Sequence, residues 1–360
     1  MQACFISVFF GNLPDPRSSR NQRHPLINIV AIAVFAVICG AQDWDDVVAF
    51  GKMRKQWLRK YLRLGRGIPS KRTFERALAA LDPDALNACF VKWTTSVFGN
   101  TEEKHIAIDG KRLRGSYQRK GKKGALHVVS VWATEDRVVF GQSAIRTKSN
   151  EITAIPKVLE LVQLRGATIT IDAMGCQKTI VQQIVAGSGH YVVAVKKNQP
   201  RLYAAIEAAF VTVEIGDEPI QHRSTFATIE RGHGRQEIRR VTALDSERLL
   251  SCREQWAGLK SIVKLESERT CKGKTTQETR YYISSHVADA QLQAKLIPDH
   301  WGIENQQHWR LDVIFHEDRN RIRKGNSAMN FAIVRRIALN TLLSAERDAA
   351  ASGHTDLNWR

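Results

Sequence analysis

The chain has 360 residues, of which 43% are hydrophobic and 25% are charged, proportions that are ordinary for a folded soluble protein. Its charge balance is not ordinary, because 54 Lys and Arg residues stand against 36 Asp and Glu residues and give a formal net charge of +18. This excess favours a polyanionic partner, either nucleic acid or an anionic membrane surface. The six cysteines are scattered without a CxxC pair, which argues against a zinc ribbon or a disulfide framework and fits a reducing cytosol.

Residues 1 to about 98 are predicted to be helical. The most apolar run, LINIVAIAVFAVICGA at 26–41, is shorter than the ~20 residues that a membrane-spanning helix needs. We therefore expect a buried core helix here and no membrane association. Further along, Ser70 is placed to cap a helix that runs from about Lys71 to Leu81.

From about residue 104 the hydrophobic period changes to that of strands. The segments HIAIDG, ALHVVSVWAT and RVVFGQSAI read as three strands, followed in order by a helix, a strand, a helix and a strand up to HYVVAVK. This is a mixed α/β order. Residues 212–285 are strand-like and separated by turns, which indicates a β-rich insertion, and residues 289–345 return to a helical pattern.

Two acids occur in matched positions. Asp109 follows the apolar residues 106–108, and Asp172 follows the apolar residues 169–171. Either acid alone is more simply a turn residue or a helix cap. Together, however, two carboxylates at one sheet edge are what a pair of magnesium ions ~3.5–4 Å apart requires for displacement at phosphorus.

Candidates for a third acidic metal ligand lie in the segment DHWGIENQQHWRLDVIFHEDRNRIR at 299–323. Glu304 and His308 are four residues apart and share a helix face, whereas Glu317 and Asp318 lie beyond that face. The apolar residues between them predict that the segment is largely buried. Buried acids need a metal ion or basic partners.

The motifs IAIDGKRLRGS, LHVVSVWA, KSNEITAIPKVLELVQLRGATITIDAMGCQ, GHYVVAVKKNQPRLY and HWGIENQQHWRLDVIFHEDRNRIR resemble those of insertion-sequence transposases of the H-repeat-associated type. The resemblance covers nearly the whole chain. It implies an α/β fold: a ribonuclease-H-like mixed-sheet catalytic core at 104–345 that carries the β-rich insertion, an N-terminal helical domain at 1–98 that recognises DNA ends, and a tail at 346–360.

The same resemblance implies a DDE triad of Asp109, Asp172 and Glu304 that holds two Mg²⁺ ions, for which Mn²⁺ can substitute. Glu317 stays open as an alternative third ligand. The chain departs from the wider class because Leu311 stands seven residues after Glu304, where relatives carry a lysine. Either Arg310 or a neighbouring histidine takes over that phosphate contact, or the copy is impaired.

Basic side chains near these acids are the predicted DNA contacts, since cations bind phosphates without regard to sequence. The predicted DNA-binding residues are Lys111, Arg112, Arg114, Lys148, Lys196, Lys197, His308 and Arg310.

The implied activity is metal-dependent cleavage of double-stranded DNA at transposon ends, followed by strand transfer into target DNA. The implied active complex contains a homodimer in the bacterial cytoplasm, at the nucleoid. Two alternatives remain open: a decayed remnant that binds DNA without cutting it, and a host metal-dependent nuclease that cuts without joining.

Overall fold

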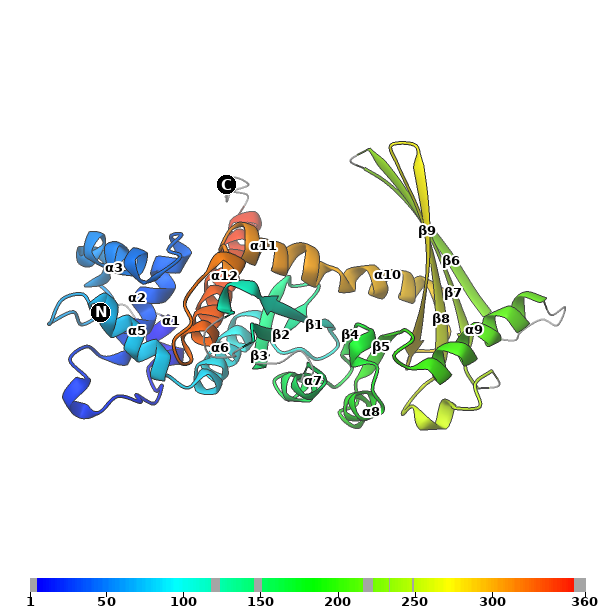
Figure 1. Cartoon of the computed structure of the whole chain (residues 1–360), viewed down its shortest axis with the longest axis horizontal. Helices are drawn as coiled ribbons and strands as arrows, with labels where there is room; N and C mark the ends of the chain where they lie inside the picture. Colours follow the sequence, from blue (N-terminus) through cyan, green and yellow to red (C-terminus); the bar gives the residue numbers. More distant parts are fainter. Residues whose placement is uncertain are drawn as a thin grey trace.

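The computed structural model describes residues 5–117, 124–145, 151–215, 223–232, 234–247 and 249–352. Lys148, most of the basic stretch after Tyr117 and the end of the predicted tail lie outside these ranges. Along the long axis of the molecule, N-terminal helices come first, then a sheet with helices on both faces, and finally a set of long strands (Figure 1).

Helices form the N-terminal part of the chain. They are α1 (Phe5–Phe10), α2 (Leu26–Ile38), α3 (Trp44–Met53), α4 (Lys55–Leu58), α5 (Lys71–Ala80) and α6 (Pro83–Phe98). Helix α2 contains the apolar run, and its residues 29–34 are at most 1% exposed, so the prediction of a buried core helix is confirmed. Among the described helices, none combines the length and the apolar character needed to cross a membrane.

One nine-stranded sheet runs through the rest of the molecule, in the order β3-β2-β1-β4-β5-β9-β8-β7-β6. Its strands are β1 (His105–Leu113), β2 (Leu126–Ala133), β3 (Val138–Ile145), β4 (Thr168–Ile171), β5 (His190–Val195), β6 (Arg223–Gly232), β7 (Arg235–Asp245), β8 (Ser261–Cys271) and β9 (Lys274–Ser284). Strands β1 to β3 pair antiparallel, whereas β4 and β5 run parallel to β1. This confirms the mixed-sheet α/β fold class.

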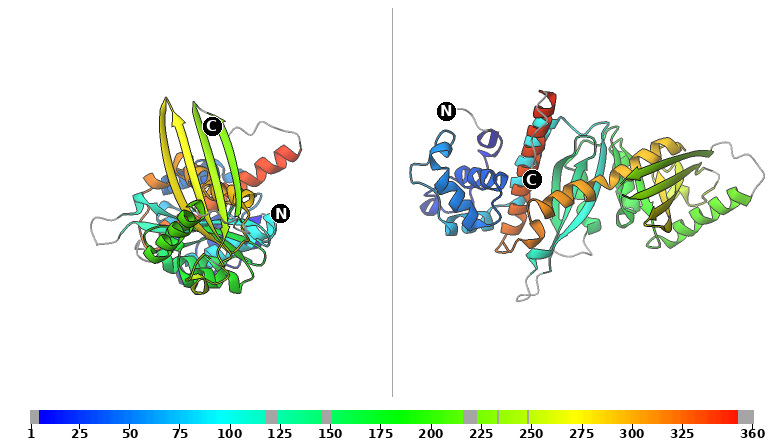
Figure 2. Two further views of the ribbon diagram at one scale, coloured as in Figure 1. Left: turned by 90° about the vertical axis from the view of Figure 1, so that its right-hand side faces the viewer. Right: turned by 90° about the horizontal axis from the view of Figure 1, so that it is seen from above.

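Helices cover both faces of the core sheet (Figures 1 and 2). On one face lie α7 (Glu151–Leu159) and α8 (Lys178–Ala186), the crossovers that make β1, β4 and β5 parallel. The other face carries α10 (Ala290–His300), the π-helical turn η6 (Ile303–His308) and α11 (Trp309–Val313). Residues 105, 107, 109 and 111 share one face of β1. This face meets the second layer, since Asp109 lies beside His308 and Lys111 pairs with Asp312.

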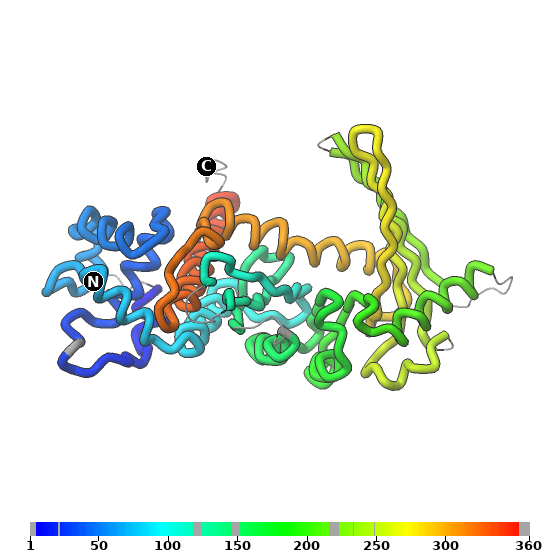
Figure 3. Tube along the Cα trace, viewed as in Figure 1, coloured from blue at the N-terminus to red at the C-terminus, as the bar shows by residue number. Residues whose placement is uncertain are grey.

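The β-rich insertion begins later than the sequence predicted. Helix α9 (Pro200–Ile215) takes up its first residues, and the strands β6 to β9 then form an antiparallel meander. Because β9 pairs with β5, the meander continues the core sheet instead of forming a separate body. Its far end rises away from the core (Figure 3).

Helix α12 (Ser327–Ala351) joins the N-terminal helices to the sheet, since it packs against α2, α5, α6 and β3. Its Asn340 amide donates to Val139 O at 2.7 Å and accepts from Val139 N at 3.0 Å. A side chain thus satisfies the backbone of the edge strand β3, which would otherwise be open to pairing with another chain.

Candidate active site

The pairing of β1 with β4 brings the two predicted aspartates together. Ile108 and Ile171 are register partners in the parallel pair, so Asp109 and Asp172 are the next residues on neighbouring strands. The strand HIAIDG was predicted to end beside its acid, and this was wrong, because Asp109 lies within β1. Strand β1 continues to Leu113 because it keeps pairing with β2 after β4 has stopped.

Asp172 lies at an exposed turn that neighbouring side chains hold in place. Its Oδ1 accepts from Met174 N at 3.0 Å and Gly175 N at 3.4 Å, which makes it the cap of the short helix η4 (Ala173–Gly175). Beyond the end of β5, Asn198 Nδ2 donates to Ala173 O at 2.6 Å. Asp172 can cap this helix and bind a metal ion at the same time, because both backbone N–H groups donate to Oδ1 and the other carboxylate oxygen is left for a metal ion.

A cavity of about 260 Å³ opens beside both acids. Its lining includes Asp109, Asp172, Arg112, His127 and Ile155. The cavity therefore joins two carboxylates to one guanidinium, a combination suited to a phosphate bridged by cations.

The segment that contains Glu304 passes over β4 and β1, close to the two aspartates. Before it, His300 Nδ1 lies 3.0 Å from Thr170 Oγ1 on β4; after it, His308 Nδ1 lies 3.7 Å from Asp109 Oδ2 on β1. Glu304 is four residues from each histidine and is exposed, in a π-helical turn of a kind frequent at functional sites. It does not line the cavity beside the aspartates.

A layer of histidines lies between α10 and the sheet. Besides His300, His105 Nε2 lies 3.0 Å from Thr170 Oγ1, and His286 Nε2 lies 3.0 Å from Thr168 Oγ1. Burial, helped by nearby positive charge, lowers the pKa of His105 to about 3 and that of His286 to about 4. Burial also lowers the pKa of His300 to about 4. All three are therefore uncharged at neutral pH.

Acid is expected to destabilise the fold through these histidines. In the unfolded chain each one binds a proton below about pH 6.5, while the folded pKa lies lower, so stability is lost as the pH falls from about 6.5 toward 4. For His105 the loss between pH 6.5 and 4.5 is on the order of 2 kcal/mol. Urea unfolding of the wild type and His105→Gln at both pH values measures it. The variant should lose less stability; equal losses would contradict the assignment.

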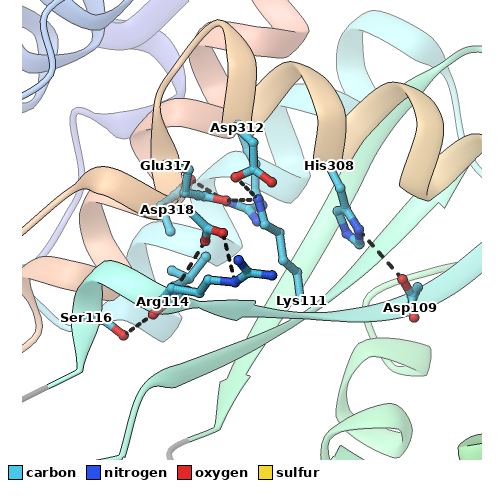
Figure 4. A network of polar contacts seen from close by, with 11 residues as sticks. Asp109, Lys111, Arg114, Ser116, His308, Asp312, Glu317 and Asp318 are labelled. Carbon is cyan, nitrogen blue, oxygen red and sulfur yellow. Dashed lines mark hydrogen bonds and ion pairs between the residues drawn. The ribbon is translucent and has the colours of Figure 1, made fainter.

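Along β1 from Asp109 lies a cluster of opposite charges (Figure 4). Lys111 of β1 is 8% exposed; it pairs with Asp312 of α11 and lies 3.6 Å from Glu317 Oε2. Glu317 also accepts from Arg336 of α12 at 2.8 Å, and both of these side chains are fully buried. The cluster ties β1, which carries Asp109, to the helical layer that carries Glu304.

The charges of this cluster hold each other ionised. Burial alone would raise the pKa of Glu317, but Arg336, Lys111 and Arg335 together lower it to about 2. Burial lowers the pKa of Arg335 to about 10. Glu317 therefore remains an anion at neutral pH with basic partners already in contact, which is the alternative to a metal ion for a buried acid.

The predicted DNA-binding residues fall into different environments. Lys196 and Lys197 are exposed beside the turn of Asp172, and Arg112 is exposed at the cavity. Lys111 is buried and ion-paired, which leaves it unavailable to a phosphate in this conformation. Lys148 lies outside the described residues.

The remaining three predicted contacts lie along the helical layer or next to it. Arg114 is exposed, with its Nε 3.5 Å from Asp318 Oδ2. Arg310 is half-buried. His308 is uncharged at neutral pH, since burial and the charge of Lys111 lower its pKa to about 3, so it can contact a phosphate only as a neutral hydrogen-bonding group.

The donor set is suited to a hard divalent cation, because Mg²⁺ takes one or two carboxylates and completes its shell with water and substrate phosphate. Asp109 and Asp172 supply these two carboxylates at the cavity. Within the described ranges, no group of three or more His, Cys, Asp or Glu side chains is placed to hold one ion. Glu304 is therefore not grouped with the two aspartates in this structure.

Sequence reasoning missed two features of the site. The first is the pair of buried arginines, Arg335 and Arg336, which pack with Glu317; the signal was an RR pair inside the apolar run FAIVRRIALN. The second is the hydrogen bond from Asn198 to Ala173 O beside the Asp172 turn; the sequence places Asn198 with Lys196 and Lys197 at a strand end near the metal edge or the DNA, without identifying this partner.

Family models and known proteins match this chain over most of its length. A family model described as Transposase DDE domain matches residues 100–341, and one described as DDE_Tnp_1-associated matches residues 8–94. The H repeat-associated protein YhhI of Escherichia coli K12 is 39% identical over 335 residues, covering 92% of this chain and 88% of that protein. YncI of Escherichia coli O157:H7 is 39% identical over 342 residues, with 94% and 86% covered.

Among solved structures, a piggyBac transposase synaptic complex with hairpin DNA matches with a TM-score of 0.47 and 10% identity, covering 99% of this chain and 73% of that chain. A likeness of that size supports no conclusion about the function. The family match and the relatives do support one: the chain belongs to the DDE transposases, together with relatives of the H repeat-associated type.

Proposed function

We propose that this chain cuts double-stranded DNA at the ends of a mobile element and joins the freed 3′ ends to target DNA. The observation that carries the proposal is the parallel register of β1 and β4, which sets Asp109 and Asp172 side by side at a cavity. Family membership supports the same reaction class.

Asp109 and Asp172 would hold the divalent ions, and Glu304 would complete the set. Bound Mg²⁺ supplies Lewis-acid activation of water and of the scissile phosphate. The protein contributes the fixed positions of the acids: Asp109 lies within a paired strand, and Asp172 is held by two backbone N–H groups. Such preorganisation is the main source of catalysis when little covalent chemistry falls to the protein.

Glu304 suits the third position better than Glu317. Glu304 is exposed and lies one turn from the histidine that meets Asp109. To reach a metal ion, Glu317 would have to leave Arg336 and Lys111, and these cations would remain buried without their partner. Removing one member of a buried ion pair costs about 3–5 kcal/mol.

Exposed cations would neutralise DNA phosphates around the acids. Arg112 at the cavity, together with Lys196 and Lys197 beside the Asp172 turn, is placed for this role. The joining reaction brings two DNA ends together, so we propose that two copies of the chain act in one complex.

A remnant that binds DNA without cutting it is the second candidate, because Glu304 is not grouped with the two aspartates in this structure. An assay on a duplex with the element's own terminal repeats, with Mg²⁺ or with EDTA, separates the candidates. A transposase gives Mg²⁺-dependent nicks at the repeat ends and then joined products. Binding without nicks would establish the remnant, and nicks without joining or repeat preference would establish a nuclease.

A further inference from the structure

A second and larger cleft lies between the N-terminal helices and the catalytic core, with a volume of about 830 Å³. The N-terminal wall consists of residues 42–45 with Lys71 and Glu75, and the core wall consists of His316, residues 319–325 and Ser327. None of these residues lines the cavity beside the aspartates, so the cleft is a separate site.

The core wall presents a row of cations. In the segment 319–324, which we name the arginine segment, Arg319, Arg321 and Arg323 are exposed, while the alternate residues Asn320 and Ile322 are half-buried and buried. Asn320 has extended backbone, with φ −68° and ψ 129°. Arg319 ends the short helix η7 (Glu317–Arg319), and exposed and inward side chains alternate past Asn320. Alternate side chains of an extended chain are about 6.6 Å apart, which is similar to the spacing of successive phosphates along a nucleic-acid strand.

The backbone of the arginine segment is held in place. Asn320 Nδ2 donates to Gln42 O at 2.6 Å, and Ile322 N donates to Asn320 Oδ1 at 2.9 Å. Gly115 packs so closely that a Cβ there would lie 2.1 Å from Asn320 O. Arg323 Nε also donates to Gly115 O at 2.8 Å. A fixed row of cations loses less conformational entropy when an anion binds than a mobile loop does.

Three cations of this segment are not ion-paired to acids in the part of the chain that the structure describes. No acid of the described residues forms an ion pair with Arg319, Arg321 or Lys324. Two exposed arginines elsewhere do pair with acids: Arg165 with Glu102 at 2.8 Å, and Arg347 with Asp136 at 3.2 Å. What distinguishes Arg319, Arg321 and Lys324 is their grouping on one wall of a large cleft, a concentration of positive charge that is suited to a polyanion.

The opposite wall contains acids, and two of them are engaged within the protein. Asp43 caps helix α3 by accepting from two backbone N–H groups, and Asp45 pairs with Lys71 at 2.5 Å. Glu75 is the other acid of this wall. A polyanion in the cleft would therefore follow the core wall, where the cations are, and lie away from the N-terminal wall.

The arginine segment is linked to the proposed active site through one strand. Strand β1 contains Asp109, and Arg114 directly after it donates from its backbone N to Asp318 Oδ1 at 3.2 Å, next to the segment. Five residues of strand span about 17 Å, which is roughly five base-pair steps at 3.4 Å each. One DNA duplex can therefore reach both places.

We infer that the arginine segment, through Arg319, Arg321 and Lys324, is a phosphate-binding site for the DNA duplex that flanks the cut. The inference rests on the proposed function in one respect, namely that the bound duplex is the one whose scissile phosphate reaches Asp109. The site binds the DNA backbone and contributes to affinity, whereas the aspartates carry out the reaction.

The test is a triple variant, Arg319→Gln with Arg321→Gln and Lys324→Gln. Its matched control removes the same charge elsewhere: Lys157→Gln with Arg165→Gln and Lys260→Gln, all exposed residues outside the cleft. Affinity for a duplex carrying one element end is measured in EDTA, between 50 and about 300 mM salt, together with each variant's melting temperature.

We expect the triple variant to bind at least ~10-fold more weakly at about 150 mM salt, with the slope of log K against log salt reduced by about 2.7 in magnitude, because each lost phosphate contact contributes about 0.9. The control should keep the wild-type slope. Equal affinity and slope for the folded triple variant and the control would overturn the inference. Since binding is read in EDTA, its outcome is independent of whether the wild type cuts DNA.

Discussion

Asp109→Asn is expected to lower the rate of DNA-end cleavage by at least ~10³-fold, which corresponds to about 4 kcal/mol of lost transition-state stabilisation. Asparagine has nearly the same shape as aspartate, so strand β1 should keep its pairing with β2 and β4. Its amide carries no charge and is a much poorer ligand for a divalent cation. The measurement is single-turnover cleavage in Mg²⁺, with DNA binding followed in parallel.

Asp172→Asn should lose cleavage to a similar degree and remain folded, because asparagine also caps helices well and can still accept from Met174 N and Gly175 N. The matched control is Glu160→Gln, which neutralises an exposed acid after α7. Both aspartate variants should bind the duplex at least as tightly as the wild type. A folded Asp109→Asn or Asp172→Asn protein that cuts within tenfold of the control would contradict their role.

The second large effect is on folding. Glu317→Gln removes the anion that partners Arg336 and Lys111 in the core, and the cost of leaving a buried charge uncompensated is about 3–5 kcal/mol. Urea unfolding followed by tryptophan fluorescence at pH 7 should show this loss. The Glu160→Gln control, at an exposed position, should stay within about 0.5 kcal/mol of the wild type.

A compensating variant separates charge burial from packing. Glu317→Leu combined with Arg336→Met removes both charges of the fully buried pair, and replacing such a pair with apolar side chains is often neutral or stabilising. We therefore expect the double variant to be more stable than Glu317→Gln. If Glu317→Gln unfolds at the wild-type urea concentration, the cluster does not stabilise the fold as described.

The sequence was sufficient to predict the core of the site because its signals are local. An apolar strand followed by an acid occurs twice, and parallel strands joined by helical crossovers end at one sheet edge. That reasoning predicted that Asp109 and Asp172 would meet, and the register of β1 with β4 shows that they do. The apolar run at 26–41 likewise identified the buried helix α2 from its length and composition.

Other features depend on partners far away in the chain. Lys111 belongs to a basic stretch directly after Asp109, as a phosphate-binding residue would, yet its partner Asp312 lies 201 positions away. No local pattern reports that pairing. The sequence also did not predict that β1 continues past Asp109, because only its pairing with β2 extends beyond that residue. The turn at Glu304 is π-helical, a form that residue spacing in the sequence does not distinguish from an ordinary helix.

The most direct test of the central claim compares Glu304→Gln with the wild type in single-turnover cleavage of an element-end duplex in Mg²⁺. Folding is checked by melting temperature and binding is measured in EDTA. We predict that Glu304→Gln melts and binds like the wild type but cuts at least ~100-fold more slowly. Wild-type cutting by Glu304→Gln, together with no cutting by a folded Glu317→Gln protein, would contradict the proposed triad and assign the third ligand to Glu317.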